Sequence, residues 1–285
     1  MTSETADAIE VRKADEVGEV YDAIDHEVLH FGYWDGEQDE SSFEYASAHL
    51  TDLVLGHLDV SDGDRILDVG CGIGGPAVHL VETTAASVVG ITISTSQVVK
   101  ARNSAERHGV AGRVSFELAD AMALPFADNS FDGAFALESI QHMDRPTALR
   151  ELARVVKPGG HIVLTDLFRR EPAPAGQESI MNVLVSMWSM SEPLALIDYP
   201  ELARAAGLRD AEVTDISENV LRRSFADVLV RVTDAIDAGT AGSLYPKGAL
   251  DLTLPENQMA VVSFTEQMIC TSEIGYLVLA ATVAG

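Results

Sequence analysis

Short runs of apolar residues alternate along the chain with longer segments whose apolar residues recur every three or four positions. Residues 66–69, 87–94, 114–118 and 161–166 form such runs, and short apolar runs between turn residues are typical of buried strands. The segments between them have helical spacing. This alternation, which continues up to residue 166, predicts a parallel sheet with right-handed helical crossovers.

The pattern also divides the chain into three parts. We predict a helical segment over residues 1–62 that closes over a ligand, and a Rossmann-like, doubly wound α/β core over residues 63–170. Residues 171–285 are expected to supply the remaining strands and an inserted helical cap, formed by residues 171–199 and 218–262. Open α/β sheets bind ligands at the carboxyl ends of their strands, so the cap should cover that edge.

Composition limits the class of protein. The chain has 285 residues, of which 47% are hydrophobic, so a sizeable core is expected. No run of 18 apolar residues predicts a membrane span, and the polar start of the sequence does not resemble a secretory signal. The only two cysteines, Cys71 and Cys270, lie far apart and are expected to be reduced thiols in a cytoplasm. No Cys/His cluster has metal-ligand spacing, so no metal site is predicted.

The formal net charge is −26, and residues 1–62 contain 17 acidic residues against Arg12 and Lys13. Phosphate backbones and anionic lipid surfaces both require basic protein surfaces. Neither a nucleic acid nor a membrane is therefore expected as a partner.

A glycine-rich turn follows the first predicted strand. Asp68 lies within the strand, and Gly70, Gly72 and Gly74 lead from it into an apolar, helix-compatible segment. Glycine permits positive φ and close backbone approach, and a helix N-terminus presents unpaired N–H donors. The turn therefore predicts a binding site for a nucleotide-like ligand.

The same turn matches the glycine spacing of dinucleotide-binding proteins through Gly70, Gly72 and Gly75. Such sites also require an acidic residue at the end of the second strand, where it binds the ribose. This chain has Thr92 and Ser94 there, which argues against a nicotinamide cofactor.

The turn instead resembles the first motif of class I S-adenosylmethionine-dependent methyltransferases. The resemblance continues in order through Asp120 and Ala121, residues 124–132 and residues 154–160. It implies a Rossmann-like fold, S-adenosylmethionine as cofactor and S-adenosylhomocysteine as product. It also implies that the backbone of the glycine turn, supported by Asp68, contacts the methionine half of the cofactor, and that Asp120 and Ala121 contact the adenine.

Residues 91–97 are similar to one branch of that family, which contains sterol, tocopherol and antibiotic-sugar methyltransferases and cyclopropane fatty-acid synthases. The resemblance implies that Thr92, Ser94 and Gln97 bind cofactor hydroxyl groups, although Ser94 and Gln97 also fit a helix cap and a solvated helix face. The resemblance also implies cofactor contacts for Leu137 and Glu138, which follow the fourth strand, and for Tyr33 in the aromatic segment 30–34. The alternative for that segment is ordinary packing of aromatic side chains in the core.

Candidate catalytic residues follow the fourth and fifth strands. Sugar O-methyltransferases of the branch carry a first histidine here that, with a later aspartate, resembles a base and its support. In this chain Gln141 replaces that histidine, while His142 and Asp166 remain, and Tyr21 is a third candidate. A neutral amide is not a useful base, so a sugar-hydroxyl acceptor loses support.

An alkene needs no base before methyl transfer, because its π electrons attack the methyl group directly. Aromatic faces stabilise the resulting cation, and Tyr21, Tyr33, Trp188 and Tyr199 are candidates for such a wall. The apolar content of residues 180–197 suits a hydrophobic acceptor as well as plain core packing or a subunit interface.

We therefore expect a methyltransferase of natural-product biosynthesis that methylates a carbon of a prenyl or terpenoid alkene in a bulky acceptor. The alternative is O-methylation of a phenol or sugar with His142 as base and Asp166 orienting it. A more remote alternative is a non-catalytic cofactor-binding scaffold. A homo-oligomer is also expected, because the amphipathic N-terminal helix could pack on a neighbouring subunit.

Overall fold

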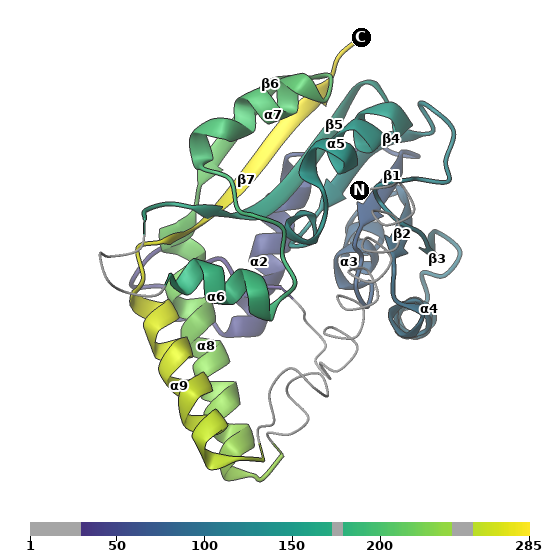
Figure 1. Ribbon diagram of the computed structural model, residues 1–285. Coiled ribbons are helices and arrows are strands. Elements are labelled where there is room, and N and C mark those ends of the chain that lie inside the picture. The colour runs from purple at the N-terminus through teal and green to yellow at the C-terminus, as the bar shows by residue number, and fades with distance from the viewer. Residues whose placement is uncertain (1–29, 173–178, 241–252) are drawn as a thin grey trace, which may run out of the picture.

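A seven-stranded sheet forms the centre of the molecule in the computed structural model, which describes residues 30–172, 179–240 and 253–285. The strand order is β3-β2-β1-β4-β5-β7-β6 (Figure 1). The strands are β1 (Arg65–Val69), β2 (Ser87–Thr92), β3 (Val114–Leu118), β4 (Phe131–Ala136), β5 (Val156–Arg169), β6 (Leu208–Asp215) and β7 (Ile274–Val283).

The first five strands are parallel, as the alternating pattern predicts. β7 then runs antiparallel to both β5 and β6. The strand–helix alternation that predicts parallel pairing ends at Asp166, so the sequence pattern carries no information on the direction of β7. The α/β class and the Rossmann-like arrangement are confirmed by the sheet and its helices.

Helices cover both faces of the sheet, which makes the fold doubly wound. One core contains buried residues of α2, α3, α4, α6 and α8, and the other contains those of α5 and α7. Successive strand residues serve opposite cores: Ile66 packs into the first and Leu67 into the second. The helices are α2 (Phe43–Gly56), α3 (Gly75–Thr83), α4 (Thr95–Arg107), η1 (Ile140–His142), α5 (Arg145–Val155), α6 (Ile180–Met187), η2 (Leu196–Asp198), α7 (Tyr199–Ala205), α8 (Ser217–Asp237) and α9 (Pro255–Cys270).

α8 and α9 form an antiparallel hairpin that projects from the sheet (Figure 1). The base of α8 fastens the aromatic segment that precedes α2. Ser224 Oγ accepts a hydrogen bond from Gly32 N at 3.2 Å, and Asn219 Nδ2 donates to Trp34 O at 2.7 Å. The guanidinium of Arg223 lies over the Trp34 ring. The hairpin therefore positions the N-terminal segment, a role that the predicted cap did not include.

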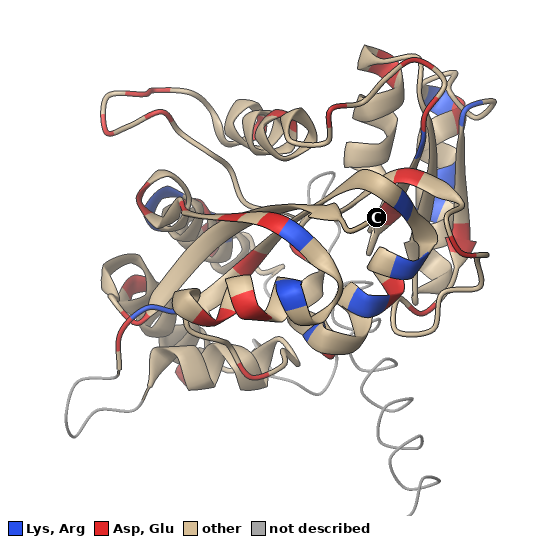
Figure 2. Ribbon diagram, turned by 90° about the horizontal axis from the view of Figure 1, so that it is seen from above, with Lys and Arg blue, Asp and Glu red and all other residues tan. Residues whose placement is uncertain are grey.

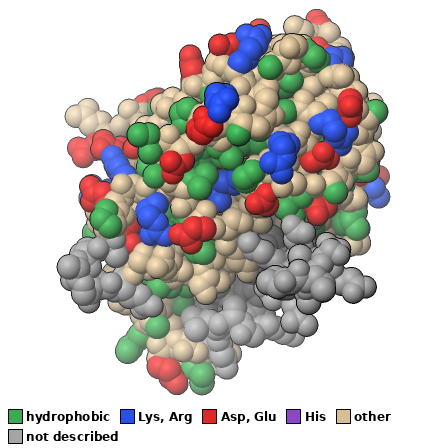
Figure 3. Space-filling view, turned by 45° about the horizontal axis from the view of Figure 1, so that its top comes forward, with side chains coloured by type: hydrophobic (Ala, Val, Ile, Leu, Met, Phe, Trp, Pro, Cys, Tyr) green, Lys and Arg blue, Asp and Glu red, His purple; other side chains and the backbone are tan. Residues whose placement is uncertain are grey.

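Charged side chains are scattered over many elements, with no continuous basic stripe among the described residues (Figure 2). A space-filling view shows acidic, basic and apolar side chains interspersed on one face (Figure 3). None of the helices in the described part of the chain is long and apolar enough to cross a membrane. The same residues contain no group of three or more His, Cys, Asp or Glu side chains placed to hold a metal ion.

Candidate active site

A cavity of about 690 Å³ opens at the carboxyl ends of β1, β2 and β4. Its lining comes from the segment before α2, from α2 itself, from the β1–α3 and β2–α4 turns, and from the loops after β3 and β4. Residues 191–194 add to it, whereas no described residue of α8 or α9 does. Of the two predicted cap segments, the first therefore reaches this cavity, and the described residues of the second do not.

The glycine turn adopts the backbone conformation that its sequence predicts. Gly70, Gly72 and Gly74 have φ values of 72°, 52° and 87°, a region that residues with a side chain rarely occupy. Gly70 and Gly72 line the cavity, and the turn leads into the N-terminus of α3. Gly70 N and Cys71 N both donate to Ile91 O at 2.9 Å, which ties the turn to β2.

Gly74 has a different role from the one implied by the resemblance. It is absent from the cavity lining and caps α3 instead. A Cβ atom there would lie 2.6 Å from the Phe116 ring, so packing and positive φ require this glycine. Gly75, the next residue, does line the cavity.

Two buried polar atoms face this cavity without a hydrogen-bond partner among the described residues, Asp68 Oδ2 and Ser47 Oγ. Burial raises the pKa of Asp68 well above its usual value. A buried carboxylate without a donor is costly, so a ligand that supplies an N–H or an ammonium group would stabilise it.

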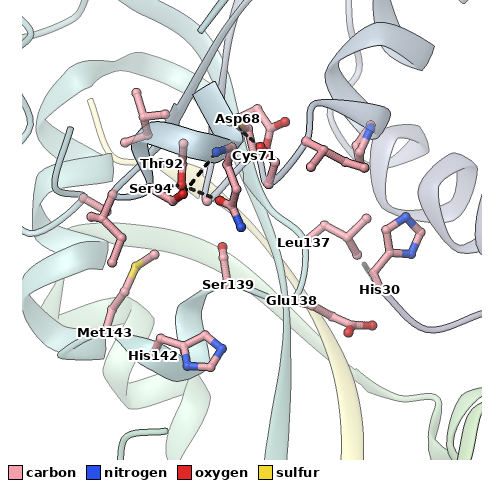
Figure 4. Close-up of a pocket in the computed structure, with 18 of the residues that line it drawn as sticks. His30, Asp68, Cys71, Thr92, Ser94, Leu137, Glu138, Ser139, His142 and Met143 are labelled. Carbon is pink, nitrogen blue, oxygen red and sulfur yellow. Dashed lines mark hydrogen bonds between the residues drawn. The ribbon is translucent and has the colours of Figure 1, made fainter. Parts of the chain in front are cut away.

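Thr92, Ser94 and Gln97 line the cavity together at the β2–α4 turn, and Figure 4 shows Thr92 and Ser94 side by side there. Thr92 Oγ1 donates to Gln97 Oε1 at 2.6 Å and accepts from Ser94 N at 3.1 Å. Ser94 Oγ also accepts from Gln97 N at 3.1 Å, which makes Ser94 the N-cap of α4. Ser94 therefore caps α4 and also lines the cavity.

The next stretch of wall is formed by Asp120, Ala121 and Met122 after β3, with Leu137 after β4. Asp120 Oδ1 accepts a hydrogen bond from Met122 N at 2.8 Å, which closes this turn. Ala121 and Leu137 are buried. Together with Ile91 and Ile93 they give a largely apolar slot of the kind that an adenine ring fills.

The aromatic segment contributes His30 rather than Tyr33. The Tyr33 ring packs edge-on against His49, with their centroids 5.0 Å apart, and is not part of the cavity lining. His30 does line the cavity, and its Nε2 lies 3.3 Å from Thr51 Oγ1. Burial lowers the pKa of His30 to about 4, so this imidazole is neutral at physiological pH.

Glu138 occupies a strained position at the end of β4. Its φ is +50°, which is uncommon for a residue with a side chain. Its Oε1 accepts hydrogen bonds from Phe31 N and from Tyr276 Oη, both at 2.8 Å. Burial raises the pKa of Glu138 to about 7, against the lowering effect of these two donors. The side chain remains partly accessible and lines the cavity.

His142 lines the cavity from η1, and Asp166, which is expected to support it, bonds to other side chains. Both carboxylate oxygens of Asp166 accept hydrogen bonds from Arg145, at 2.5 and 3.0 Å, and Tyr199 Oη donates at 2.7 Å. Asp166 is 1% exposed and absent from the cavity lining. The Asp166 carboxylate is therefore held by Arg145 and Tyr199, and its support of His142 stays a prediction.

Two residues of the expected aromatic wall, Tyr199 and Trp188, do not line the cavity. Tyr199 is buried in the core between α5 and α7, where it bonds to Asp166. Trp188 packs on the other core and does not line the cavity. Tyr21, the third catalytic candidate, lies outside the described residues.

Sequence reasoning missed several lining residues: His30, Ser47, Thr51, Ser139 and Arg145. Of these, only Arg145 could have been expected from the sequence, because it is a charged residue three positions after His142, at the start of α5. Ser47 and Thr51 lie on α2, His30 precedes the segment that α8 contacts, and Ser139 lies between β4 and η1.

Comparison with known proteins places the chain in a family. Residues 67–164 match the methyltransferase domain family. The chain is 40% identical over 212 residues to methyltransferase GfsG of Streptomyces halstedii, covering 71% of this chain and 76% of that protein. It is 41% identical over 212 residues to the 27-O-demethylrifamycin SV methyltransferase of Amycolatopsis mediterranei, covering 71% and 77%.

A solved structure supports the fold. Geranyl diphosphate C-methyltransferase from Streptomyces coelicolor, in complex with S-adenosyl-L-homocysteine, matches with a TM-score of 0.71 over 95% of this chain and 97% of that one. Its sequence identity is 17%, so it shows the fold alone. Taken with the relatives, these findings place the chain in the class I S-adenosylmethionine-dependent methyltransferases, and it is an enzyme of natural-product biosynthesis that uses S-adenosylmethionine.

The cavity fits that cofactor. Asp68 Oδ2 and Ser47 Oγ lack partners among the described residues, and the α-ammonium group of the methionine half would supply donors to both. Positive φ at Gly70 and Gly72 leaves backbone exposed beside them. The hydroxyl and amide groups at the β2–α4 turn suit the ribose, and the slot around Ala121 suits the adenine.

Proposed function

We propose that this enzyme methylates an alkene carbon in the prenyl or terpenoid chain of a bulky, hydrophobic natural product. In its most specific form the proposal is the C-methylation step of teleocidin biosynthesis, in which methylation of an indole alkaloid's prenyl chain triggers cyclisation. The general pattern of the sequence supports this form.

The proposal rests mainly on one observation: the histidine–carboxylate pair expected of an O-methyltransferase is altered in this chain. A hydroxyl acceptor requires a group that removes its proton, commonly a histidine oriented by a carboxylate. Here Gln141 stands in the first histidine position, and the Asp166 carboxylate is held by Arg145 and Tyr199. A site without that pair suits an acceptor that needs no base before transfer.

When bound, S-adenosylmethionine supplies an electrophilic methyl group on a sulfonium. The residues of this chain align acceptor and methyl group and exclude water, and alignment alone is worth ~7–11 kcal/mol. Leu137 and the buried turn after β4 provide a dry wall at that point. The acceptor π electrons form the new carbon–carbon bond, and the resulting cation later loses a proton to a side chain in the cavity.

O-methylation of a phenol or sugar hydroxyl is the second candidate, with His142 as base. It is favoured by the name of the relative from Amycolatopsis mediterranei, which describes an oxygen acceptor. His142 lines the cavity, which supports this role. In this reading Asp166 acts through Arg145 and the packing of η1. A non-catalytic scaffold remains the third candidate.

The deciding experiment incubates the full chain with methyl-labelled donor and matched acceptor pairs. One member of each pair is a prenylated indole with its hydroxyl groups blocked, and the other is a saturated-chain analogue with free hydroxyls. Labelling of the blocked alkene, with the new methyl on carbon by NMR, is expected. Labelling of the saturated analogue alone would replace the proposal with O-methylation, and binding of S-adenosylhomocysteine without any labelling would favour the scaffold.

We also propose a cytoplasmic homo-oligomer with the three-part division of residues 1–62, 63–170 and 171–285. The amphipathic pattern near the N-terminus and the two unpaired cysteines support these assignments. Light scattering of the purified chain measures the oligomeric state directly, and a monomer at all concentrations would contradict that part.

A further inference from the structure

We propose that Glu138 is a catalytic residue that faces the reacting carbon, stabilises the carbocation formed by methyl transfer and accepts its proton, with Tyr276 as its positioning residue. This inference rests on the proposed C-methylation. It assigns Glu138 to the acceptor, whereas the family resemblance implies a contact with the cofactor.

The position of Glu138 supports this role. It follows β4, at the carboxyl end of the sheet where open α/β folds bind their ligands. In Figure 4 the Glu138 side chain lies below Leu137 and extends away from His142, with its carboxylate on the same side as His30. Glu138 lines the cavity and has a strained φ of +50°, and strain of this kind is concentrated at functional positions.

The hydrogen bonds of Glu138 leave one oxygen available. Among the described residues, both recorded bonds to its carboxyl group fall on Oε1, from Phe31 N and Tyr276 Oη. Glu138 N donates to Thr165 Oγ1 at 2.9 Å, which fixes the backbone. Tyr276 is fully buried. Oε1 is thereby anchored, and Oε2 is the oxygen that a ligand in the cavity can reach.

The electron balance of the step is complete without another reactant. Two π electrons of the acceptor form a bond to the methyl carbon as the methyl–sulfur bond breaks, and that bond's electron pair stays with sulfur. A neighbouring acceptor carbon becomes a cation, which the negative Glu138 carboxylate stabilises. A C–H bond beside the cation then breaks, its electron pair forms a new alkene, and the proton moves to Glu138.

Glu138 is better suited to this step than His142. A neutral imidazole accepts a proton but carries no charge to stabilise a cation, whereas a carboxylate does both. The titratable and charged groups around Glu138 are His30 before α2, His142 on η1, Tyr276 on β7 and the Arg145–Asp166 pair behind them. The pKa of Glu138 near 7 lets it be ionised before transfer and protonated afterwards.

The first test is infrared titration of the full chain bound to S-adenosylhomocysteine, which carries no sulfonium charge. The C=O band of a protonated carboxyl group is expected to disappear with a midpoint near pH 7. Glu138→Gln should lack this band, and Glu117→Gln on the exposed face of β3 should keep it. Absence of any carboxyl group that titrates in this range would overturn the proposal without involving an acceptor.

The second test measures turnover and product. Glu138→Gln is expected to lower kcat at least about 100-fold while the affinity for S-adenosylhomocysteine stays within about twofold, because the amide keeps the shape but not the charge. Tyr276→Phe removes a donor to the charged form, so the midpoint of the pH–rate profile should move upward and activity should recover at higher pH.

The outcomes separate the two proposals. A C-methylated product with unchanged turnover in Glu138→Gln would overturn the role of Glu138 alone. A pH inflection that persists in Glu138→Gln and disappears in His142→Asn would do the same and assign the titration to His142. A product methylated only on oxygen would overturn C-methylation and the cation role with it.

Discussion

The cofactor half and the acceptor half of the cavity are built in different ways. The proposed cofactor half uses turns that are local in sequence: residues 68–75 from the end of β1 to the start of α3, and residues 92–97 from the end of β2 into α4. The acceptor half depends on contacts between distant residues. Asp166 binds Tyr199, which is 33 residues away, and Glu138 binds Tyr276, which is 138 residues away.

This difference explains why one half is readable from sequence and the other is not. A glycine turn owes its shape to backbone conformation, which the residue types themselves restrict. The partner of a buried carboxylate depends on which helix packs over it. Asp166 shows this, because its ion-pair partner is Arg145 at the start of α5 and not a histidine.

The largest expected effect breaks the cofactor half. Gly72→Val should weaken binding of S-adenosylhomocysteine by more than about 100-fold, since 1.4 kcal/mol already corresponds to tenfold. Gly72 has a φ of 52° at the cavity wall, and a β-branched residue is strongly disfavoured there. Isothermal titration calorimetry measures the affinity.

The matched control is Gly112→Val, where φ is not positive and no atom lies within 4 Å of an added Cβ. It should bind normally. Far-UV circular dichroism shows whether each variant is folded. A folded Gly72→Val protein with normal affinity would remove the turn from the cofactor site.

The fold itself was largely predictable from the sequence. The apolar runs at residues 114–118, 66–69 and 87–94 agree with β3, β1 and β2 to within two residues at each end. Hydrophobic periodicity reports which face of an element is buried, and that information is local. The antiparallel direction of β7 was not predictable, because a mostly apolar strand such as residues 274–283 carries no signal of its direction.

The second effect concerns the acceptor half and its stability. Arg145→Met should lower the free energy of unfolding by about 3–5 kcal/mol, because it leaves the buried Asp166 charge without its cationic partner and with Tyr199 as its remaining donor. The two side chains are 3% and 0% exposed. Urea denaturation measures this loss. Arg204→Met breaks an exposed ion pair with Glu201 and should change stability little; equal losses in both variants would show that Arg145 is not specially coupled to Asp166.

The third effect tests which residue accepts the proton that the acceptor loses. With Glu138 as acceptor of the proton, His142→Ala should lower kcat only about tenfold through lost packing of η1, short of the 10²–10⁴ range typical of a lost general base. The affinity for S-adenosylhomocysteine should stay within about twofold. His57→Ala, which changes an exposed histidine after α2, is the control. A loss above about 1,000-fold would instead make His142 the base.

Three of the residues expected at the cofactor site from the sequence line the cavity and share one property. Thr92, Ser94 and Gln97 lie within six residues of one another, so their positions follow from a single turn. Tyr33 and Gly74 were expected at the cofactor and do not line the cavity. In both cases the residue type fitted the motif, but packing against His49 and Phe116 decided its role.

The smallest effect lies within that turn. Thr92→Val keeps the side-chain shape and removes the hydroxyl that donates to Gln97 Oε1 and accepts from Ser94 N. A neutral hydrogen bond contributes about 0.5–1.5 kcal/mol, so the affinity for S-adenosylhomocysteine should fall roughly three- to tenfold. Thr214→Val on the exposed side of β6 should bind normally. An unchanged affinity in Thr92→Val would show that the hydroxyl network caps α4 without orienting Gln97 towards the ligand, and the cofactor half would then depend on backbone geometry alone.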